Sequence, residues 1–424
     1  MVPGISRRGR WSASFAVRSG RRVTAACSLI GALTVLSTGL APSASAADVQ
    51  SQQWYLSAMK ADEMWKVSTG KGIKVAVVDT GVNLNTPSLK GQVLAGEVPK
   101  AVGYKATEDY DGHGTSMAEL IAGTGAGDGL KGLAPGAKIV PYRLAMKDMK
   151  DGSEKEKAPE LPDVIRAIAD SDAKIISMSF GEDIERPDVL AAVEYARAKG
   201  KLMVAATGND AQEKNFIGYP AAYPYVVGVA ASDKSGTVGK FSEHGNYVDL
   251  AAPGLDVPTW CDNTFRSYCN GQGTSQATAI ASASAALIWS AHPDWTANQV
   301  LASLIDTAGR DWAKDDPSTY LGYGLIRPRM VLEQSNFNPG GADTDPLARE
   351  NATGVTDEAG NSPSAPASSS SPPSKATSGG QTSAAASTSD TSDNTTMWIA
   401  LGAAAAVLVI GGGAFAVLRS RRAT

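Results

Sequence analysis

The 424-residue sequence predicts an α/β fold with a mostly parallel central sheet and helices on both of its faces. Short β-branched runs alternate with longer helical patterns, as they do when crossover helices join parallel strands. The predicted strands are 73–78, 138–142, 175–179, 202–206 and 226–230. The predicted helices are 114–122, 161–171, 188–199 and 276–291. Residues 74–78 are nearly all apolar, as expected for a strand buried on both faces.

Charge and cysteine content narrow the class of protein. The formal net charge is -4, so the balance of charges gives no reason to expect a nucleic-acid partner. Of the three cysteines, Cys27 lies in an N-terminal apolar stretch, which leaves Cys261 and Cys269 for the folded part. In an exported protein such a pair indicates one disulfide, and two free buried thiols are the alternative.

The N-terminus has the pattern of a secretory signal peptide. Residues 1–22 contain six arginines and no acidic residue, and an apolar run follows at 23–40. Ala44-Ser-Ala46 then matches the small-x-small pattern of a cleavage site. We therefore expect a signal peptide at residues 1–46, with a retained membrane anchor as the alternative.

The C-terminus predicts a membrane anchor. Residues 397–418 are uncharged and apolar, which is long enough to cross a bilayer as a helix. The basic residues at 419–424 favour a cytoplasmic tail and an extracellular main domain. A buried soluble helix is the alternative. Residues 336–396 are rich in Ser, Thr, Ala and Pro and predict a disordered tether.

Three residues form a candidate catalytic set. Asp79 directly follows the first predicted strand, at the sheet edge where α/β proteins place functional groups. His113 lies between glycines just before a predicted helix, and Ser275 opens another, where a helix dipole stabilises an oxyanion. Each alone would more often be a turn or cap residue. Together they supply a nucleophile, a base that activates it and a carboxylate that orients the base.

The chain resembles a subtilisin-like serine protease, and the order Asp, His, Ser is that of subtilisin. The matching stretches, in order, are Val75-Ala-Val-Val-Asp-Thr-Gly-Val82, Asp111-Gly-His-Gly-Thr115, Gly132-Leu-Ala-Pro-Gly136, Ala205-Ala-Thr-Gly-Asn209, Phe241-Ser-Glu-His-Gly245, Leu250-Ala-Ala-Pro-Gly254 and Gly273-Thr-Ser275. They imply a subtilisin-like domain over 73–335 and a serine-type endopeptidase that acts on polypeptides.

The resemblance also implies roles for other residues. Asn209 would form the oxyanion hole together with Ser275. The substrate-binding residues would be Ser179, Phe180, Gly181, Ala206, Thr207 and Gly208. No cofactor is expected, and no metal-binding residues can be matched to the family.

A short N-terminal arm, a tether and one C-terminal helix resemble the mycosins, membrane-anchored subtilases associated with type VII secretion in actinobacteria. Residues 47–72 are too few for a folding prodomain, so we expect an arm that packs on the domain through Trp54 and Trp65. Mycosins often have a cysteine in the His-motif loop, where this chain has Glu108-Asp-Tyr-Asp111. Two functions follow: an endopeptidase at the cell membrane that processes exported proteins, or a component that stabilises a secretion complex.

Overall fold

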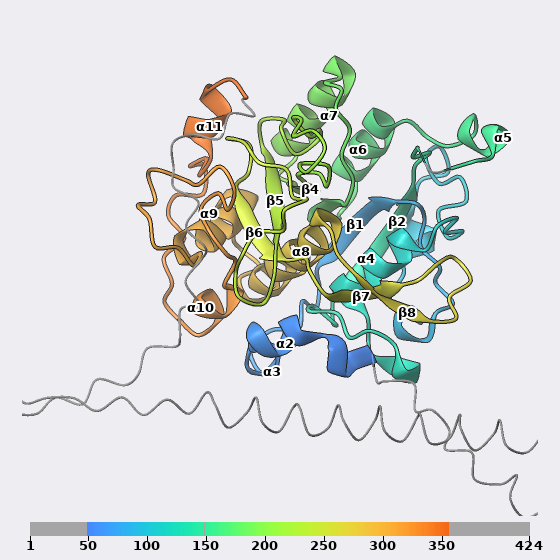
Figure 1. The fold of residues 1–424 in the computed structure, drawn as a ribbon, viewed down its shortest axis with the longest axis horizontal. Helices are drawn as coiled ribbons and strands as arrows, with labels where there is room; N and C mark the ends of the chain where they lie inside the picture. Colours follow the sequence, from blue (N-terminus) through green and yellow to red (C-terminus); the bar gives the residue numbers. More distant parts are fainter. Residues whose placement is uncertain (1–48, 148, 356–424) are drawn as a thin grey trace, which may run out of the picture. The chain divides into compact units, whose positions relative to one another are not determined.

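The computed structural model describes residues 49–147 and 149–355, and these contain a six-stranded parallel sheet (Figure 1). Its strands lie in the order β2-β1-β3-β4-β5-β6. Their bounds are Lys74–Asp79 (β1), Lys138–Arg143 (β2), Ile175–Met178 (β3), Leu202–Ala206 (β4), Val226–Ser232 (β5) and Leu250–Pro253 (β6). The predicted α/β class and parallel sheet are confirmed. The sequence did not predict β6 as a strand; it lies inside a motif that carried only the family resemblance.

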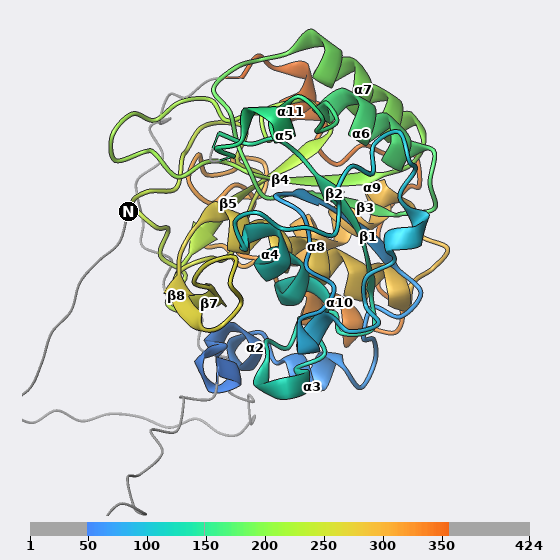
Figure 2. The ribbon, with the colours of Figure 1, turned by 90° about the vertical axis from the view of Figure 1, so that its right-hand side faces the viewer.

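Helices cover both faces of the sheet, and alternate side chains of β1 point to the two faces. Val75 and Val77 pack into the core beneath α4 and α8, whereas Ala76 and Val78 pack into the core beneath α6 and α7. Figure 2 shows the two helical layers on opposite sides of the strands. The main helices are α4 (His113–Ala122), α6 (Leu161–Ala169), α7 (Pro187–Ala198), α8 (Thr274–Ala291), α9 (Ala297–Thr307) and α10 (Pro328–Leu332).

Smaller elements complete the described part of the chain. A two-stranded antiparallel hairpin, β7 (Val257–Trp260) and β8 (Tyr268–Gly271), lies outside the main sheet. Proline in the first turn helps to start α6, α7 and α10, because its φ suits a helix and its missing N–H is not needed there. The short helices are η1 (Val49–Gln52), α2 (Trp54–Ala58), α3 (Ala61–Met64), η2 (Pro87–Leu89), η3 (Ala95–Glu97), η4 (Ala126–Asp128), α5 (Gly152–Lys155) and α11 (Ala348–Ala352).

Helix α8 runs through the core and is built almost entirely of small residues. Its residues from Thr274 to Trp289 are all buried. Its buried hydroxyls have hydrogen-bond partners. Ser284 donates to the Ile280 carbonyl of the same helix at 2.8 Å, and Ser282 donates to the Ser177 hydroxyl of β3 at 3.0 Å. Small side chains therefore let α8 approach the sheet closely without leaving these buried polar groups unpaired.

The N-terminal residues 49–72 pack on the domain. Trp54 Nε1 donates to the Leu255 carbonyl at 3.0 Å, and Trp65 Nε1 donates to the Leu133 carbonyl at 2.8 Å. Both indoles are only partly buried, whereas Tyr55 and Met64 are 0% and 1% exposed in the main core. The sequence predicts packing through Trp54 and Trp65, but the most deeply buried apolar side chains of the arm are Tyr55 and Met64.

Residues 336–355 differ from the tether that the sequence predicts at 336–396. Leu347 is buried in the main core, and the Asn351 Oδ1 accepts from the Tyr225 backbone N–H at 3.0 Å. Tyr323 donates to Glu350 at 2.5 Å, and Asn246 donates to the Gly354 carbonyl at 2.9 Å. A few well-placed side chains suffice to fix this segment, although its composition is that of a linker.

The predicted signal peptide, membrane helix, cytoplasmic tail and remaining tether lie outside the described residues. Within residues 49–147 and 149–355, no helix is long and apolar enough to span a membrane.

A chain that starts at Gly72 should be markedly less stable than one that starts at Ala47, with both ending at Val355. Loss of the arm leaves the sites of Tyr55 and Met64 unfilled. Burying one such side chain stabilises the folded state by about 1.5–3 kcal/mol. Thermal unfolding measures the difference. Both chains should still cleave peptides at a temperature where both are folded. If the longer chain is inert until the arm is cut, the arm is an inhibitor instead.

Candidate active site

Asp79 and His113 form a hydrogen-bonded pair at the carboxyl edge of the sheet. Asp79 is the last residue of β1 and is fully buried, and His113 is the first residue of α4. His113 Nδ1 lies 2.7 Å from Asp79 Oδ1, so Nδ1 carries a proton toward the carboxylate and Nε2 faces away from it. The His113 side chain is 30% exposed, which leaves part of the ring open to solvent.

The local backbone brings the pair together because both neighbours of His113 are glycines. Gly112 has φ +98°, a left-handed conformation that L side chains rarely adopt. A Cβ on Gly114 would lie 2.2 Å from the Gly81 carbonyl oxygen and 3.0 Å from Asp79 Cβ. The start of α4 can therefore lie directly against the end of β1 only with glycine at 114.

The pKa of His113 reflects two opposing effects. Burial lowers it, but the charge of Asp79 and the hydrogen bond to it raise it, with smaller contributions from Asp109 and Asp111, to about 9. The imidazolium is thus stabilised well above the ordinary value of 6.5.

Asp109 holds the residues around His113 and Asp79 together, and it is not among the site residues that the sequence predicts. Its Oδ1 accepts from the Thr80 hydroxyl at 2.8 Å and from the Gly112 backbone N–H at 2.8 Å. Its Oδ2 accepts from the backbone N–H and hydroxyl of Thr115, at 2.8 and 2.6 Å. Asp109 therefore holds the His113 loop to the residue after Asp79. Its position just before the His motif was the available signal.

Ser275 is the second residue of α8 and is 7% exposed. Its hydroxyl donates to the Ser179 carbonyl at 2.8 Å, and the Ser179 hydroxyl donates to the Ser275 carbonyl at 3.1 Å. In this structure the Ser275 hydroxyl is thus directed at the segment after β3, not at His113. The neighbouring Gln276 and His113 line one cavity, which places the start of α8 beside the imidazole.

Asn209 contacts the same end of α8. Its Oδ1 accepts from the Thr274 backbone N–H at 2.9 Å and from the Thr274 hydroxyl at 3.1 Å. These two donors fix the amide orientation. The Nδ2 group is therefore directed away from the two Thr274 donors.

The predicted substrate-binding residues lie in two adjacent segments. Ser179, Phe180 and Gly181 follow β3, and Ala206, Thr207 and Gly208 end or follow β4. The two strands pair in parallel with Met178 beside Ala205, so both segments leave the sheet at the same edge. Gly208 has φ +120°, which favours glycine at this position.

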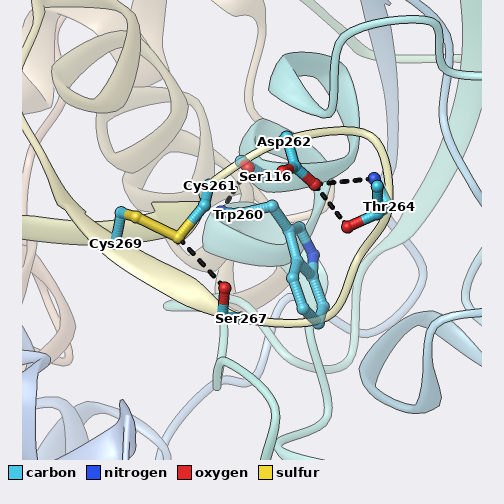
Figure 3. Close-up of a disulfide and its surroundings, with 7 residues drawn as sticks. All are labelled: Ser116, Trp260, Cys261, Asp262, Thr264, Ser267 and Cys269. Carbon is cyan, nitrogen blue, oxygen red and sulfur yellow. Dashed lines mark hydrogen bonds between the residues drawn. A yellow bond between two sulfur atoms is a disulfide. The ribbon is translucent and has the colours of Figure 1, made fainter.

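A cavity of about 170 Å³ opens beside His113, next to the β7–β8 hairpin. A disulfide between Cys261 and Cys269 closes this hairpin, and Figure 3 shows Trp260 beside it. The Trp260 ring stacks on Tyr268. The backbone N–H of Trp260 donates to the Ser116 hydroxyl of α4 at 3.0 Å. The cavity is lined by Asp111, His113, Ser116, Thr259, Trp260, Cys261, Asp262 and Gln276.

The parallel sheet, the acid–imidazole pair and the buried serine at a helix start define a serine-type endopeptidase. The chain belongs to the subtilase family, whose model matches residues 70–324. Among the described residues, no cluster of three or more His, Cys, Asp or Glu side chains could hold a metal ion.

Individual relatives agree with this family. Thermitase of Thermoactinomyces vulgaris is 33% identical over 280 residues, which cover 64% of this chain and 95% of thermitase. Minor extracellular protease Epr of Bacillus subtilis (strain 168) is 34% identical over 294 residues, 68% of this chain but 42% of Epr. Among solved structures, the MycP3 protease from the type VII (ESX-3) secretion system has a TM-score of 0.54 at 29% identity, covering 66% of this chain and 87% of MycP3. The resemblance to subtilases and mycosins is confirmed.

We expect Asp79→Asn to lower the pKa of His113 from about 9 to its ordinary value or below, because burial then acts without the opposing charge. Titration of histidine-labelled protein by nitrogen-15 NMR measures this shift. His292, which does not contact Asp79, is the internal control. A His113 pKa that is the same in both proteins would contradict the assigned cause.

Proposed function

We propose that this protein is a membrane-anchored extracellular endopeptidase that hydrolyses peptide bonds through Asp79, His113 and Ser275. The observation that carries the proposal is the 2.7 Å contact between Asp79 Oδ1 and His113 Nδ1, next to the start of α8. With Nδ1 engaged, Nε2 is the nitrogen that accepts a proton in the neutral form of the imidazole, and this form increases as the pH rises toward the His113 pKa of about 9. That is the arrangement a serine nucleophile requires of its base.

The first chemical step is attack of Ser275 Oγ on the scissile carbonyl carbon. The hydroxyl leaves the Ser179 carbonyl, rotates toward His113 and gives its proton to Nε2 as the new C–O bond forms. Such catalytic contacts are often unformed in an empty enzyme and close only with substrate. Asp79 remains ionised and stabilises the imidazolium.

The negative oxygen of the tetrahedral intermediate needs donors. The backbone N–H of Ser275 lies in the first turn of α8, where helix N–H groups have no partner within the helix. The Nδ2 group of Asn209 supplies a second donor, with its orientation fixed by Thr274. His113 then protonates the leaving amine, and water hydrolyses the acyl-enzyme by the same route in reverse.

The substrate backbone would bind as an extended strand beside Ser179–Gly181, in the manner of peptides that add to a strand edge. The side chain on the acyl side of the cleaved bond would enter between this segment and Ala206–Gly208. Both segments leave the same edge of the sheet, which supports a shared role in binding.

The site of action is the outer face of a cell membrane. The signal-peptide pattern at 1–46 and the apolar segment at 397–418 support this location. Exported polypeptides are then the available substrates. Similarity to MycP3, a protease from a type VII secretion system, favours a second function, in which the protein binds and stabilises such a complex.

Replacing Ser275 by alanine should lower kcat by about 10⁶-fold, because the acyl-enzyme can no longer form. A fluorophosphonate probe should label the wild-type protein at Ser275, as located by mass spectrometry, and should not label Ser275→Ala. Ser284→Ala is a matched control on the same helix, since the Ser284 hydroxyl only bonds to the Ile280 carbonyl. Full activity in Ser275→Ala would refute the mechanism.

The same variant separates the two functions in cells. If secretion continues with Ser275→Ala but stops on deletion of the protein, the binding function is supported. If both cause unprocessed substrates to accumulate and secretion to stop, proteolysis is the essential activity.

Asn209→Ala should lower kcat by about 10²–10³ with little change in KM, because it loses a donor that acts mainly in the transition state. Asn209→Asp should lower kcat at least as much, because its carboxylate also repels the oxyanion. Aspartate keeps the acceptor for Thr274, whereas alanine removes it. Only the alanine variant should therefore also lose about 1 kcal/mol of stability from the start of α8. Steady-state kinetics and thermal unfolding distinguish the two effects, and a change confined to KM would exclude Asn209 from the oxyanion hole.

A further inference from the structure

The two predicted substrate-binding segments, 179–181 and 206–208, lie close together, and we call the narrow gap between them the slot. A Cβ on Gly181 would lie 3.7 Å from the Ala206 carbonyl oxygen and 4.0 Å from Gly208 Cα, across the slot. A Cβ at 181 would therefore contact the opposite segment, and a larger side chain there would fill the gap. Glu182 and Tyr219 exchange two backbone hydrogen bonds of 2.8 Å at one end, which joins the segment 218–219 to the slot.

Glu243 packs against two glycines beside this slot, Gly208 and Gly218. A Cβ on Gly208 would lie 2.1 Å from Glu243 Oε2, and a Cβ on Gly218 would lie 3.4 Å from the same oxygen. The Glu243 backbone N–H donates to the Gly208 carbonyl at 3.1 Å, which holds the residue in place. Its carboxylate therefore occupies the space that a side chain at 208 would need.

This carboxylate is chemically unusual for the interior of a protein. Glu243 is 0% exposed, and among the described residues no side chain bonds to its carboxylate; only the backbone of Asp210 lies near enough to act as a weak donor. Burial raises its pKa to about 8; the backbone of Asp210 opposes this shift, while the charges of Asp210 and Asp183 add to it. A buried carboxylate normally has a cation or several donors beside it. The proposed catalytic mechanism has no use for Glu243.

We propose that Glu243 selects peptides with lysine or arginine on the acyl side of the cleaved bond. A long basic side chain entering the slot would bring a cation and several N–H donors to two oxygens that lack side-chain partners. Asp183 and Asp210, both exposed, add negative charge around the same site and favour the approach of a cation. The inference rests on the proposed peptidase function and on the placement of the substrate in this slot.

Because Glu243 is fully buried, the residues around it must move slightly for a basic side chain to reach its carboxylate. Local movement of side chains and loops on binding is common at such sites. A smaller apolar side chain would occupy the slot without reaching Glu243 and would leave its oxygens without a side-chain partner. The difference in binding free energy between basic and apolar substrates is the source of the selectivity.

The test uses the full chain and matched peptides that differ only in arginine or leucine at the acyl-side position. We expect wild-type kcat/KM to favour arginine. Glu243→Gln should reduce the arginine-to-leucine ratio by about 30- to 1000-fold, the range expected when one partner of a buried charge contact is lost. Asp210→Asn is the matched control. It removes a charge from the exposed rim and should change the ratio less than about fivefold, because solvent screens it.

A pH series gives a second, independent readout. Glu243 must be ionised to hold the cation, so the arginine-to-leucine ratio should rise with pH through about 8 in the wild type. His113 titrates equally for both peptides, so its effect cancels in the ratio. In Glu243→Gln the ratio should not depend on pH. This comparison distinguishes Glu243 from the charges of Asp183 and Asp210, which remain in that variant.

Binding separates failure of this inference from failure of the peptidase proposal. Product peptides that end in arginine or leucine are titrated into Ser275→Ala, where no catalysis is needed. Tighter binding of the arginine peptide, lost on adding Glu243→Gln, supports the inference even if no peptide is cleaved. Equal binding of the two peptides, or a wild-type ratio that Glu243→Gln leaves unchanged, would overturn it while leaving the catalytic proposal intact.

Discussion

The buried carboxylate of Asp79 ties several parts of the active site to the sheet. Its Oδ1 accepts from the Thr80 backbone N–H at 2.7 Å and lies 2.7 Å from His113 Nδ1. Thr80 in turn bonds to Asp109 through its hydroxyl, and Asp109 holds the start of α4. Because a buried charge is costly without its donors, α4 cannot shift relative to β1 without a large loss of stability. The imidazole is thereby fixed by the fold itself.

A second constraint joins α8 to β3. The Ser282–Ser177 hydrogen bond lies within the core, and the reciprocal bonds between Ser275 and Ser179 lie at its edge. The serine and one wall of the slot are therefore parts of one packed unit. Close approach of this kind requires small residues along the helix, so the composition of α8 is dictated by where Ser275 must lie.

How much the sequence reveals depends on the range of the interactions involved. The alternation of strand and helix patterns is readable from neighbouring residues, and it identifies most of the sheet. The glycines beside His113 indicate that two backbone segments approach closely there. Asp109 acts through contacts with Thr80 and Thr115 that no local pattern records. Glu243 lies inside a recognised motif, yet its lack of side-chain partners becomes visible only when distant glycines are placed around it. The amino-acid composition of residues 336–355 also gives a wrong prediction of a tether, because a few specific contacts decide the structure and an average composition does not record them.

The N-terminal arm can be regarded as a ligand that the chain carries for its own domain. Gln53 exchanges two hydrogen bonds with the backbone of Lys131, and Tyr55 fills the core, while Val67 between arm and domain is 56% exposed. Covalent attachment gives such a ligand a high effective concentration, so it rebinds as soon as it dissociates. A single cut near Val67 would leave a two-chain complex that remains folded in concentrated solution. Dilution below its dissociation constant would then release the arm, so that stability would come to depend on protein concentration.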